Sequence, residues 1–337
     1  MSREWRRMLS KMTIRKLWNA FRIFASFYYS RVTSRPVVSG LPISLSFEPT
    51  TSCNLRCPEC PSGQRSFTRH TGMLDPDLFR RVIDEQASTL FYLIFYFQGE
   101  PYLNPNFLDM VGYASARKIY TATSTNGHYL NDDNCRRTIT SGLDRLIVSL
   151  DGVSQATYKQ YRIGGEVNKV IEGARRMVAW KKKLGVQHPY LIFQFLVVKP
   201  NEHEIEAARE LCRDIGFDEI RFKTAQLYDY EHGNPLIPEN SKYSRYVKNT
   251  DGTYRIKNSL ENHCWKMWHS SVITWDGKVV PCCFDKDAHY VLGTAGKNSF
   301  SQIWYSDEYR KFRKRLLMGR SQVEICSNCS EGTRVWA

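Results

Sequence analysis

Long apolar runs are missing from this 337-residue sequence. The longest one, Leu90–Phe97, has the length of a β-strand and falls short of the roughly 20 residues that a membrane-spanning helix needs. No export signal is recognisable either, because Arg15, Lys16 and Arg22 interrupt the partly apolar N-terminal stretch and no A-x-A cleavage site follows it. We therefore expect a cytoplasmic protein.

Acidic residues are few relative to basic ones, with 34 Asp and Glu against 48 Lys and Arg and a net charge of +14. This excess favours anionic partners such as phosphates, acidic proteins or anionic lipid, but it does not indicate a fold. The first 40 residues hold much of it, with nine Lys or Arg against one Glu.

Apolar residues recur at helical spacing within this basic segment and predict an amphipathic helix. They are Ile14, Leu17, Trp18, Phe21, Ala25 and Tyr28, whereas Lys11, Arg15 and Arg22 fall on another face. Two interpretations remain open. Either the helix lies on an anionic membrane surface, which would make the protein peripheral at the inner face of the membrane, or it covers an open edge of the main domain.

From residue 43 onward, strand-like and helix-like patterns alternate, which predicts parallel β/α units. The expected strands are Ile43–Pro49, Tyr92–Gln98, Tyr120–Thr125, Arg145–Leu150, Leu191–Val198 and Glu219–Thr224. The expected helices are Asp77–Ser88, Asn106–Ala116, Asp132–Ser141, Asn168–Leu184 and Glu202–Ile215. In parallel β/α folds, active sites lie at the carboxyl ends of the strands.

Cysteine usage indicates metal binding in a reducing compartment rather than disulfides. Cys53, Cys57 and Cys60 follow the first expected strand at C-x3-C-x2-C spacing, in a stretch broken by prolines. Three thiolates in one loop can hold an iron–sulfur cluster and leave one coordination position open. The alternatives are a zinc knuckle or three reduced core cysteines.

A second cysteine set follows near the end of the sequence and predicts a closed site with four thiolates. Its members are Cys264, Cys282, Cys326 and Cys329, and the adjacent Cys283 is an alternative to Cys282. The segment Val272–Pro281 between the first two predicts a β-hairpin with an Asp-Gly turn. Either zinc or an iron–sulfur cluster would satisfy such a set.

The cysteine triplet resembles the cluster motif of the radical S-adenosylmethionine (radical SAM) enzymes. The resemblance implies an α/β fold, a partial (β/α)6 TIM-like barrel, with a [4Fe–4S] cluster that reductively cleaves SAM to a 5′-deoxyadenosyl radical. That radical abstracts hydrogen from the substrate. Strand ends carry matching elements: Gln98, Gly99 and Glu100 are similar to the family's Gly-Gly-Glu motif for the SAM amino group, with Gln98 in place of one glycine.

Further matches follow at the next strand ends. Ser124 and Asn126 look like the small polar loop that faces SAM, and Ser149 and Asp151 are similar to the element near the ribose. Arg162 stands where related enzymes place an arginine against the SAM carboxylate. Taken singly, the glycines at these ends could be turn residues and Ser124 or Asp151 could be helix caps. Glu59 departs from the family's pattern, which favours an aromatic or apolar residue there.

The C-terminal cysteines resemble a truncated SPASM or twitch extension, a small β-hairpin/helix domain, which implies one auxiliary [4Fe–4S] cluster. The expected divisions are a basic helix (1–42), the barrel (43–226), a linker or loop (227–260) and the auxiliary domain (261–337). The resemblance implies an oxidoreductase that modifies a peptide or protein side chain, or an envelope sugar or lipid. A flavodoxin- or ferredoxin-type electron donor would dock on the basic run Tyr309–Arg315, which is otherwise a solvated helix face. The different-class alternative is a non-catalytic zinc protein that contacts nucleic acid through its basic surface, but no nucleic-acid module is recognisable and we expect no nucleic-acid partner.

Overall fold

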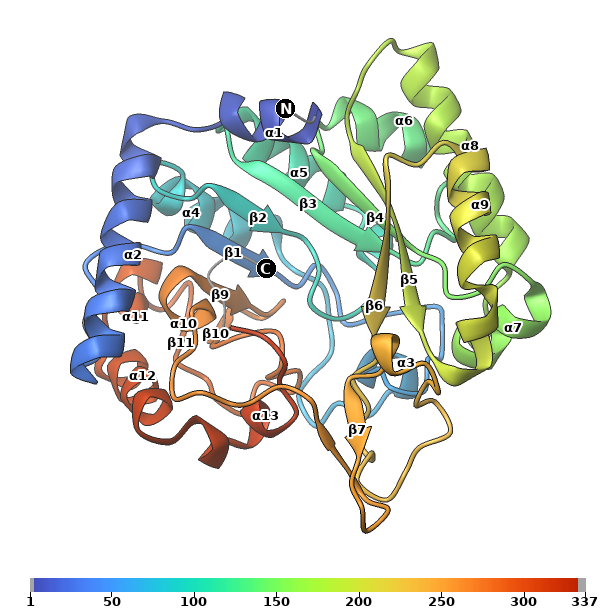
Figure 1. Ribbon diagram of the computed structural model, residues 1–337. Helices are drawn as coiled ribbons and strands as arrows, with labels where there is room; N and C mark the ends of the chain where they lie inside the picture. The colour runs from blue at the N-terminus through green and yellow to red at the C-terminus, as the bar shows by residue number, and fades with distance from the viewer. Residues whose placement is uncertain (1–2, 333–337) are drawn as a thin grey trace. The chain divides into compact units, whose positions relative to one another are not determined.

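The computed structural model describes residues 3–332, so residues 1–2 and 333–337, at the two ends of the expected domains, lie outside the described residues. The chain divides into two compact units. The first comprises Met1–Ser52, Phe67–Thr121 and Ser259–Ala337, and the second comprises Cys53–Ser66 and Ala122–Asn258. Each unit combines strands of a β-sheet with covering helices (Figure 1).

The first unit contains strands in the order β11-β10-β9-β1-β2. Their bounds are β1 Ser44–Phe47, β2 Tyr92–Ile94, β9 Ser270–Ile273, β10 Lys278–Val280 and β11 Gly293–Thr294. Strand β1 pairs in parallel with both β2 and β9, and all four of its residues are buried, as expected for a strand covered on both faces. Strands β9 and β10 form the predicted hairpin, in which Gly277 adopts a φ of +85° at the turn.

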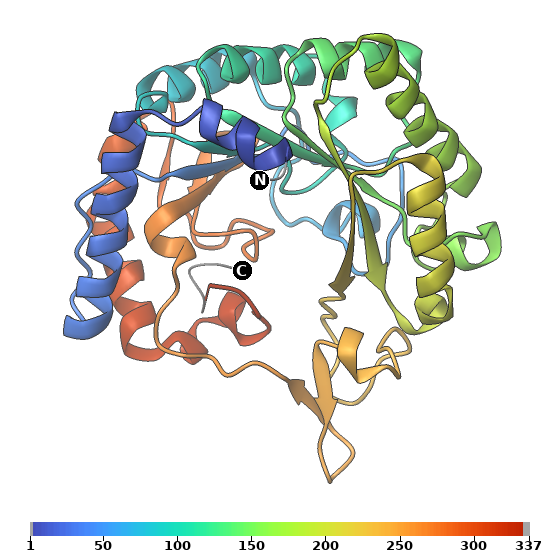
Figure 2. The same ribbon diagram turned by 45° about the horizontal axis from the view of Figure 1, so that its top comes forward.

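Helices from both ends of the chain, together with α4 and α5, cover this part of the sheet. They are α1 Arg3–Ser10, α2 Ile14–Thr33, α4 Pro76–Gln86, α5 Phe107–Ala116, α10 Lys266–His269, α11 Phe300–Trp304, α12 Asp307–Gly319 and α13 Glu324–Ser327, with 3-10 turns η1 Pro101–Leu103 and η4 Arg320–Gln322. The N-terminal segment lies beside the C-terminal one (Figures 1 and 2). The Phe27 ring of α2 lies 5.1 Å from that of Trp265, and Trp268 donates a hydrogen bond to the Val37 carbonyl oxygen at 3.0 Å.

The second unit contains strands in the order β3-β4-β5-β6, all parallel. Their bounds are β3 Tyr120–Thr125, β4 Arg145–Ser149, β5 Tyr190–Val197 and β6 Glu219–Thr224, and the division between the units falls inside β3. The helices are α3 Pro61–Gln64, α6 Asp132–Thr140, α7 Gln155–Tyr161, α8 Val167–Lys183 and α9 Ile205–Ile215, with 3-10 turns η2 Lys199–Glu204 and η3 Ser241–Tyr243. Helix α9 packs on β5 and β6.

The stretch that the sequence pattern leaves as a linker or loop has a structure of its own. Strands β7 (Tyr246–Lys248) and β8 (Tyr254–Ile256) form a separate antiparallel hairpin there. Tyr246 is buried, and its hydroxyl accepts a hydrogen bond from the Leu227 amide at 2.8 Å. This hydrogen bond connects the β7–β8 hairpin to the segment that follows β6.

The predicted alternation of strands and helices is confirmed. Most boundaries agree within two residues, and the two that differ by more are corrected. Strand β2 ends at Ile94 rather than at Gln98, because the Tyr96 carbonyl oxygen accepts from the Ser46 hydroxyl at 2.7 Å. Helix α9 begins at Ile205 rather than at Glu202, since the preceding η2 turn contains Pro200. Within the described residues, no helix is long and apolar enough to cross a membrane.

Candidate functional site

The cysteine triplet lies in the second unit, in an irregular loop that ends at helix α3. Cys57 is buried, and Cys53 and Cys60 are half-buried. The loop turns back at its end, because the Cys60 amide donates to the Cys57 carbonyl oxygen at 3.3 Å and the Gln64 amide donates to the Cys60 carbonyl oxygen at 2.9 Å. A side chain could not be added at Gly63, whose Cβ would lie 2.6 Å from the Cys57 nitrogen.

Two of the predicted SAM-contacting side chains reach sulfur atoms of this loop. The Asn126 amide nitrogen, just after β3, lies 3.8 Å from the Cys53 sulfur and 2.7 Å from the Asn54 side-chain oxygen. An Arg162 terminal nitrogen, just after α7, lies 3.8 Å from the Cys57 sulfur. Both are donors that stabilise a thiolate, so the chemistry of the donor set fits a cluster held by three cysteines.

The predicted residue Asp151 is the partner of Arg162. Its carboxylate is fully buried at the end of β4, where one oxygen accepts from the Arg162 Nε at 2.6 Å and the other accepts from the Leu196 amide at 2.7 Å. The pKa of the Arg162 guanidinium is raised well above its ordinary value; burial opposes this shift, but the Asp151 charge outweighs it. The ion pair therefore fixes the guanidinium beside the cysteine loop.

The Cys57 thiol itself resists ionisation when no metal is bound. Burial raises its pKa, and the neighbouring Arg162 only partly opposes this shift. A bound metal would remove that proton, because a coordinating thiol is deprotonated. Ser124 and Ser149, also predicted to face SAM, lie at the ends of β3 and β4 with their hydroxyl oxygens 3.4 Å apart.

An apolar cluster of the second unit surrounds the loop. Its buried members are Leu55, Cys57, Tyr161, Val198, Ala225, Leu227, Ile237 and Tyr246, and Cys53 and Cys60 pack against it. The unusual Glu59 has a role here that the sequence pattern did not reveal, because its carboxylate accepts from the Tyr228 amide at 3.0 Å. It ties the segment after β6 to the cysteine loop.

The predicted Gly-Gly-Glu-like turn lies in the first unit, against the residues that lead into the loop. Gly99 has a φ of +74°, and a Cβ there would lie 2.1 Å from the Thr50 carbonyl oxygen. The Glu100 amide donates to the Ser52 carbonyl oxygen at 2.8 Å, and both Gln98 and Glu100 are buried. Only glycine allows this approach, so the turn is built closely onto the chain just before Cys53.

A buried ion pair at the end of β1 was not predicted from the sequence. The Arg69 guanidinium makes two hydrogen bonds to the Glu48 carboxylate, at 2.8 Å and 2.5 Å. The Glu48 carboxylate also accepts from the Trp275 amide at 3.2 Å, at the turn between β9 and β10. Burial raises the pKa of Glu48, and the Arg69 charge opposes the shift. Arg69 and Glu48 are 21 residues apart, and no sequence motif indicates that they pair.

The C-terminal cysteines lie near enough to one another in the first unit for their charges to interact. Burial raises the pKa of Cys282, and the neighbouring Cys283, Cys264 and Cys329 raise it further. Arg320 is fully buried, and its guanidinium donates to the Cys329 sulfur at 3.3 Å, a contact that sequence reasoning missed.

Cys283, the alternative to Cys282, lies beside Lys266. The Lys266 amine lies 3.9 Å from the Cys283 sulfur and forms an ion pair with Glu331. Among residues 3–332, no three Cys, His, Asp or Glu side chains are gathered closely enough to hold a single metal ion. The donor chemistry, four thiols with a guanidinium and a backbone N–H directed at sulfur, fits an iron–sulfur cluster.

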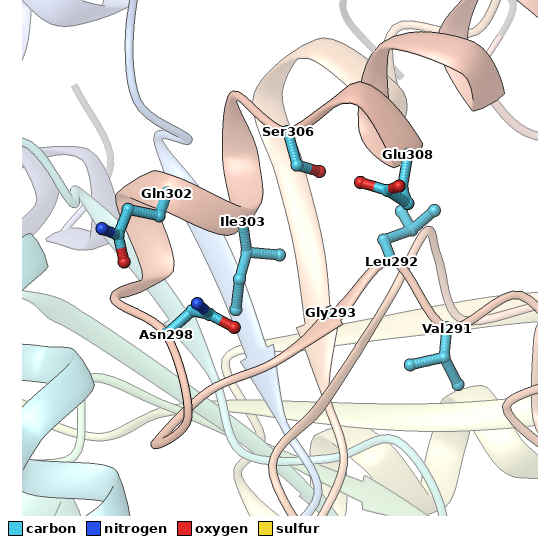
Figure 3. A pocket seen from close by; sticks show the side chains of 8 residues that line it. All are labelled: Val291, Leu292, Gly293, Asn298, Gln302, Ile303, Ser306 and Glu308. Carbon is cyan, nitrogen blue, oxygen red and sulfur yellow. The ribbon is translucent and has the colours of Figure 1, made fainter.

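A pocket of about 360 Å³ lies elsewhere in the first unit. It is bordered by the strand β11 segment and by helices α11 and α12, which contribute Ile303 and Glu308 (Figure 3). None of the predicted cluster or SAM residues lines it. The pocket is therefore separate from the candidate chemistry.

Comparisons with known proteins agree with the geometry. The sequence model of the radical SAM superfamily matches residues 47–218, about half of the chain, and that of the SPASM iron–sulfur cluster-binding domain matches residues 264–330. The chain therefore belongs to the radical SAM superfamily, and it carries a SPASM domain.

Curated relatives and a solved structure show the same likeness. A tungsten-containing aldehyde ferredoxin oxidoreductase cofactor-modifying protein of Pyrococcus furiosus is 24% identical, over 85% of this chain and 86% of its own. The PqqA peptide cyclase of Gluconobacter oxydans is also 24% identical, over 88% and 84%. The crystal structure of Streptococcus suis SuiB bound to the precursor peptide SuiA matches with a TM-score of 0.64 and 13% identity, over 93% of this chain and 74% of that one.

These findings settle the class of protein and its cofactors. The chain is an enzyme with the predicted α/β radical SAM fold, and it uses a [4Fe–4S] cluster, SAM and an auxiliary iron–sulfur cluster. The alternative of a non-catalytic zinc protein is wrong. Like other enzymes of its class, the protein needs a reductant.

Proposed function

We propose that Cys53, Cys57 and Cys60 hold the SAM-binding cluster of this enzyme. The observation that carries the proposal is that Asn126 and Arg162 approach the sulfur atoms of Cys53 and Cys57, which lie in one loop. When bound, the cluster and SAM supply one-electron cleavage of SAM and hydrogen abstraction from an unactivated carbon.

The chain's own residues position these cofactors. We assign the SAM amino group to Gln98, Gly99 and Glu100, its ribose side to Ser149 and Asp151, and its carboxylate to Arg162. Ser124 and Asn126 form the small polar loop that faces SAM. The apolar cluster around Leu55, Tyr161 and Val198 keeps water from the loop. Exclusion of water matters because the 5′-deoxyadenosyl radical of this enzyme class would otherwise be quenched by side reactions.

The auxiliary cluster is assigned to Cys264, Cys282, Cys326 and Cys329. Cys282 is preferred to Cys283 because Cys264 raises the pKa of Cys282, whereas Lys266 is the principal charged neighbour of Cys283; Cys329 raises the pKa of both. We retain the expected divisions of the chain at residues 42, 226 and 260 as part of the proposal.

Release of 5′-deoxyadenosine tests the reaction. Purified, anaerobically reconstituted protein incubated with SAM and dithionite is expected to release it, and a Cys57→Ala variant is expected to release none. Cys135→Ala is the matched control, because that thiol is also buried but lies on helix α6. Equal release by wild type and Cys57→Ala would contradict the assignment.

For the substrate we propose a peptide or protein side chain. A peptide cyclase is among the relatives, and SuiB, which shares the fold, is bound to a precursor peptide. An envelope sugar or lipid is the second candidate, favoured by the exposed apolar residues of α2. We propose a cytoplasmic location with peripheral attachment at the inner face of the membrane.

Deuterium transfer distinguishes these substrates. Cells grown in deuterated medium are separated into peptide and membrane fractions, and each is supplied to the enzyme with SAM and reductant. The fraction that holds the substrate is expected to place deuterium into 5′-deoxyadenosine. Transfer from peptides alone supports the first candidate, and transfer from membranes alone supports the second.

Helix α12 provides a docking surface for an acidic flavodoxin or ferredoxin. Arg310, Lys311, Lys314 and Arg315 are exposed on it. The predicted solvated face is wrong for Arg313, which is buried 4.2 Å from the Trp304 and Tyr309 rings. We expect Lys311→Glu/Lys314→Glu to slow reduction by such a donor but not by dithionite. Unchanged reduction by the protein donor would place its docking surface elsewhere.

A further inference from the structure

Helix α2 exposes its apolar side to solvent. The outer face of α2, defined as Ile14, Leu17, Trp18, Phe21 and Tyr28, is exposed, with Ile14 at 87% and Trp18 at 61% of their full surface. The Trp18 and Phe21 rings stack at 5.4 Å. The predicted helix and its apolar stripe are confirmed, but the stripe is not the side that packs on the protein.

Polar side chains on the opposite side of α2 form hydrogen bonds with other segments of the first unit. Lys16 is buried, and its amine donates to the carbonyl oxygens of Lys11 and Lys118. Asn19 exchanges two hydrogen bonds with the Leu41 backbone, at 2.8 Å and 2.9 Å. Ser30 donates to the Val37 carbonyl oxygen at 2.9 Å.

Two apolar residues complete this attachment. Ile23 and Phe27 are buried, and the Phe27 ring lies against Trp265 and Trp268. The usual surface helix buries its apolar stripe and exposes its polar one. Here the anchors fix the reverse orientation, so the outer face of α2 cannot turn inward without breaking buried hydrogen bonds.

The charges around this face identify what covers it. Arg15 and Arg22 are exposed on α2, Arg31 is exposed but lies 3.5 Å from the Glu261 carboxylate, and the helix itself contains no acidic residue. A second copy of the chain would bring these arginines against their own equivalents, which like-charge repulsion disfavours. An anionic lipid surface accepts both the cations and the apolar side chains, and Trp and Tyr favour its interface.

We propose that the outer face of α2 docks on an anionic lipid bilayer, with the helix axis in the plane of the membrane. The aliphatic and aromatic side chains enter the headgroup region, and the arginines pair with lipid phosphates or carboxylates. The rigid attachment of α2 carries the rest of the first unit with it. This inference deepens the proposed peripheral location and does not depend on catalysis.

Flotation with lipid vesicles tests the proposal without any turnover. The full-length protein is expected to bind phosphatidylcholine vesicles that contain phosphatidylglycerol, and to bind pure phosphatidylcholine vesicles at least about tenfold more weakly. Binding is expected to weaken likewise in 0.5 M salt, since salt screens the attraction. Equal binding to both vesicles would overturn the charge argument, and no binding to either would overturn the proposal.

Matched variants separate this face from the rest of the surface. Trp18→Ser/Phe21→Ser is expected to lower vesicle affinity at least about tenfold, whereas Met318→Ser, which replaces an apolar residue 70% exposed on α12, is expected to leave it unchanged. Circular dichroism and iron content establish that each variant folds. Unchanged binding by the double variant would contradict the proposal, as would a wild-type dimer that the double variant disperses.

Depth of insertion gives a second readout. Brominated phosphatidylglycerol is expected to quench tryptophan fluorescence in the wild type, and Trp18→Phe is expected to bind equally while losing most of that quenching. Full quenching in Trp18→Phe would assign the contact to another surface and overturn the proposal.

Discussion

At the scale of single residues, Gly99 shows how closely the expected SAM turn is built. Its Cβ position is occupied by the Thr50 carbonyl oxygen, and its φ of +74° costs about 1–2 kcal/mol for any other L-residue. We expect Gly99→Ala to displace the turn and to weaken SAM binding at least about tenfold, with the iron content retained. Equilibrium dialysis with labelled SAM measures this.

Gly185→Ala is the control for backbone strain alone. Gly185 has a φ of +65°, but nothing lies within 4 Å of its Cβ position. Gly185→Ala is expected to lose only about 1–2 kcal/mol of stability, from backbone strain, and no SAM affinity. Wild-type SAM affinity in Gly99→Ala would show that the turn does not contact the cofactor.

The ion pair between Arg69 and Glu48 is the residue-scale test of stability. Removing one partner of a buried pair leaves an uncompensated charge and typically costs about 3–5 kcal/mol. The side chains here are 4% and 0% exposed, so we expect Arg69→Met to lower the free energy of unfolding by about that amount. Denaturant unfolding followed by fluorescence measures it.

An exposed pair provides the comparison. Arg80→Met, which removes the pairing with Asp77 on α4, is expected to cost at most about 1 kcal/mol because both side chains face water. If the two variants lost equal stability, the buried pair would not have the role assigned to it.

At the scale of elements, the loop after β3 carries a pH dependence. His128 accepts a hydrogen bond from the Glu166 amide at its Nε2, 2.9 Å away, and its Nδ1 lies 3.0 Å from the side-chain oxygen of Asn126. The Nε2 atom must therefore be unprotonated. Burial is the main cause that lowers the pKa of His128 below its ordinary value of 6.5.

The sign of the effect follows from the lowered pKa. Below pH 6.5 the unfolded chain binds the proton before the folded one does, so the contribution of His128 to the free energy of unfolding falls as the pH decreases and is constant above that value. His269, whose pKa burial lowers to about 3, adds a decrease of the same sign, so the comparison between variants isolates the part that belongs to His128. Urea midpoints between pH 7.5 and 5.5 measure it. His128→Gln is expected to flatten this slope, and an unchanged slope would contradict the tautomer assigned here.

Sequence patterns predict elements better than they predict partners. The bounds of β3 and β6 are as expected, because alternating apolar residues end at recognisable turns. The end of β2 could not be predicted, since it depends on a hydroxyl of β1. The orientation of α2 could not be predicted either, because distant carbonyl groups at Lys118 and Leu41 hold its polar side.

The candidate site likewise contains residues that the sequence reveals and residues that only the fold reveals. The triplet Cys53, Cys57 and Cys60 is visible in the sequence because close spacing brings the thiols into one loop. Arg320 could not be found, since its approach to Cys329 arises only from folding. The same is true of the contact between Glu59 and Tyr228.

At the scale of the whole molecule, the account requires two clusters per chain. Anaerobically reconstituted wild type is expected to hold about eight irons, and a Cys326→Ser/Cys329→Ser variant about four. Iron and zinc are counted together by mass spectrometry. Two zincs in place of iron, or an unchanged iron count in the variant, would contradict the assignment of the C-terminal cysteines.

The central claim is that three sulfurs leave one iron open for SAM, and hyperfine spectroscopy tests it most directly. In the Cys326→Ser/Cys329→Ser variant, the reduced cluster at Cys53, Cys57 and Cys60 is examined with SAM that contains ¹⁵N in its amino group. The account predicts a strong coupling between the ¹⁵N nucleus and the cluster, absent without SAM. A cluster that binds SAM with no such coupling, or that has a fourth protein ligand, would contradict it.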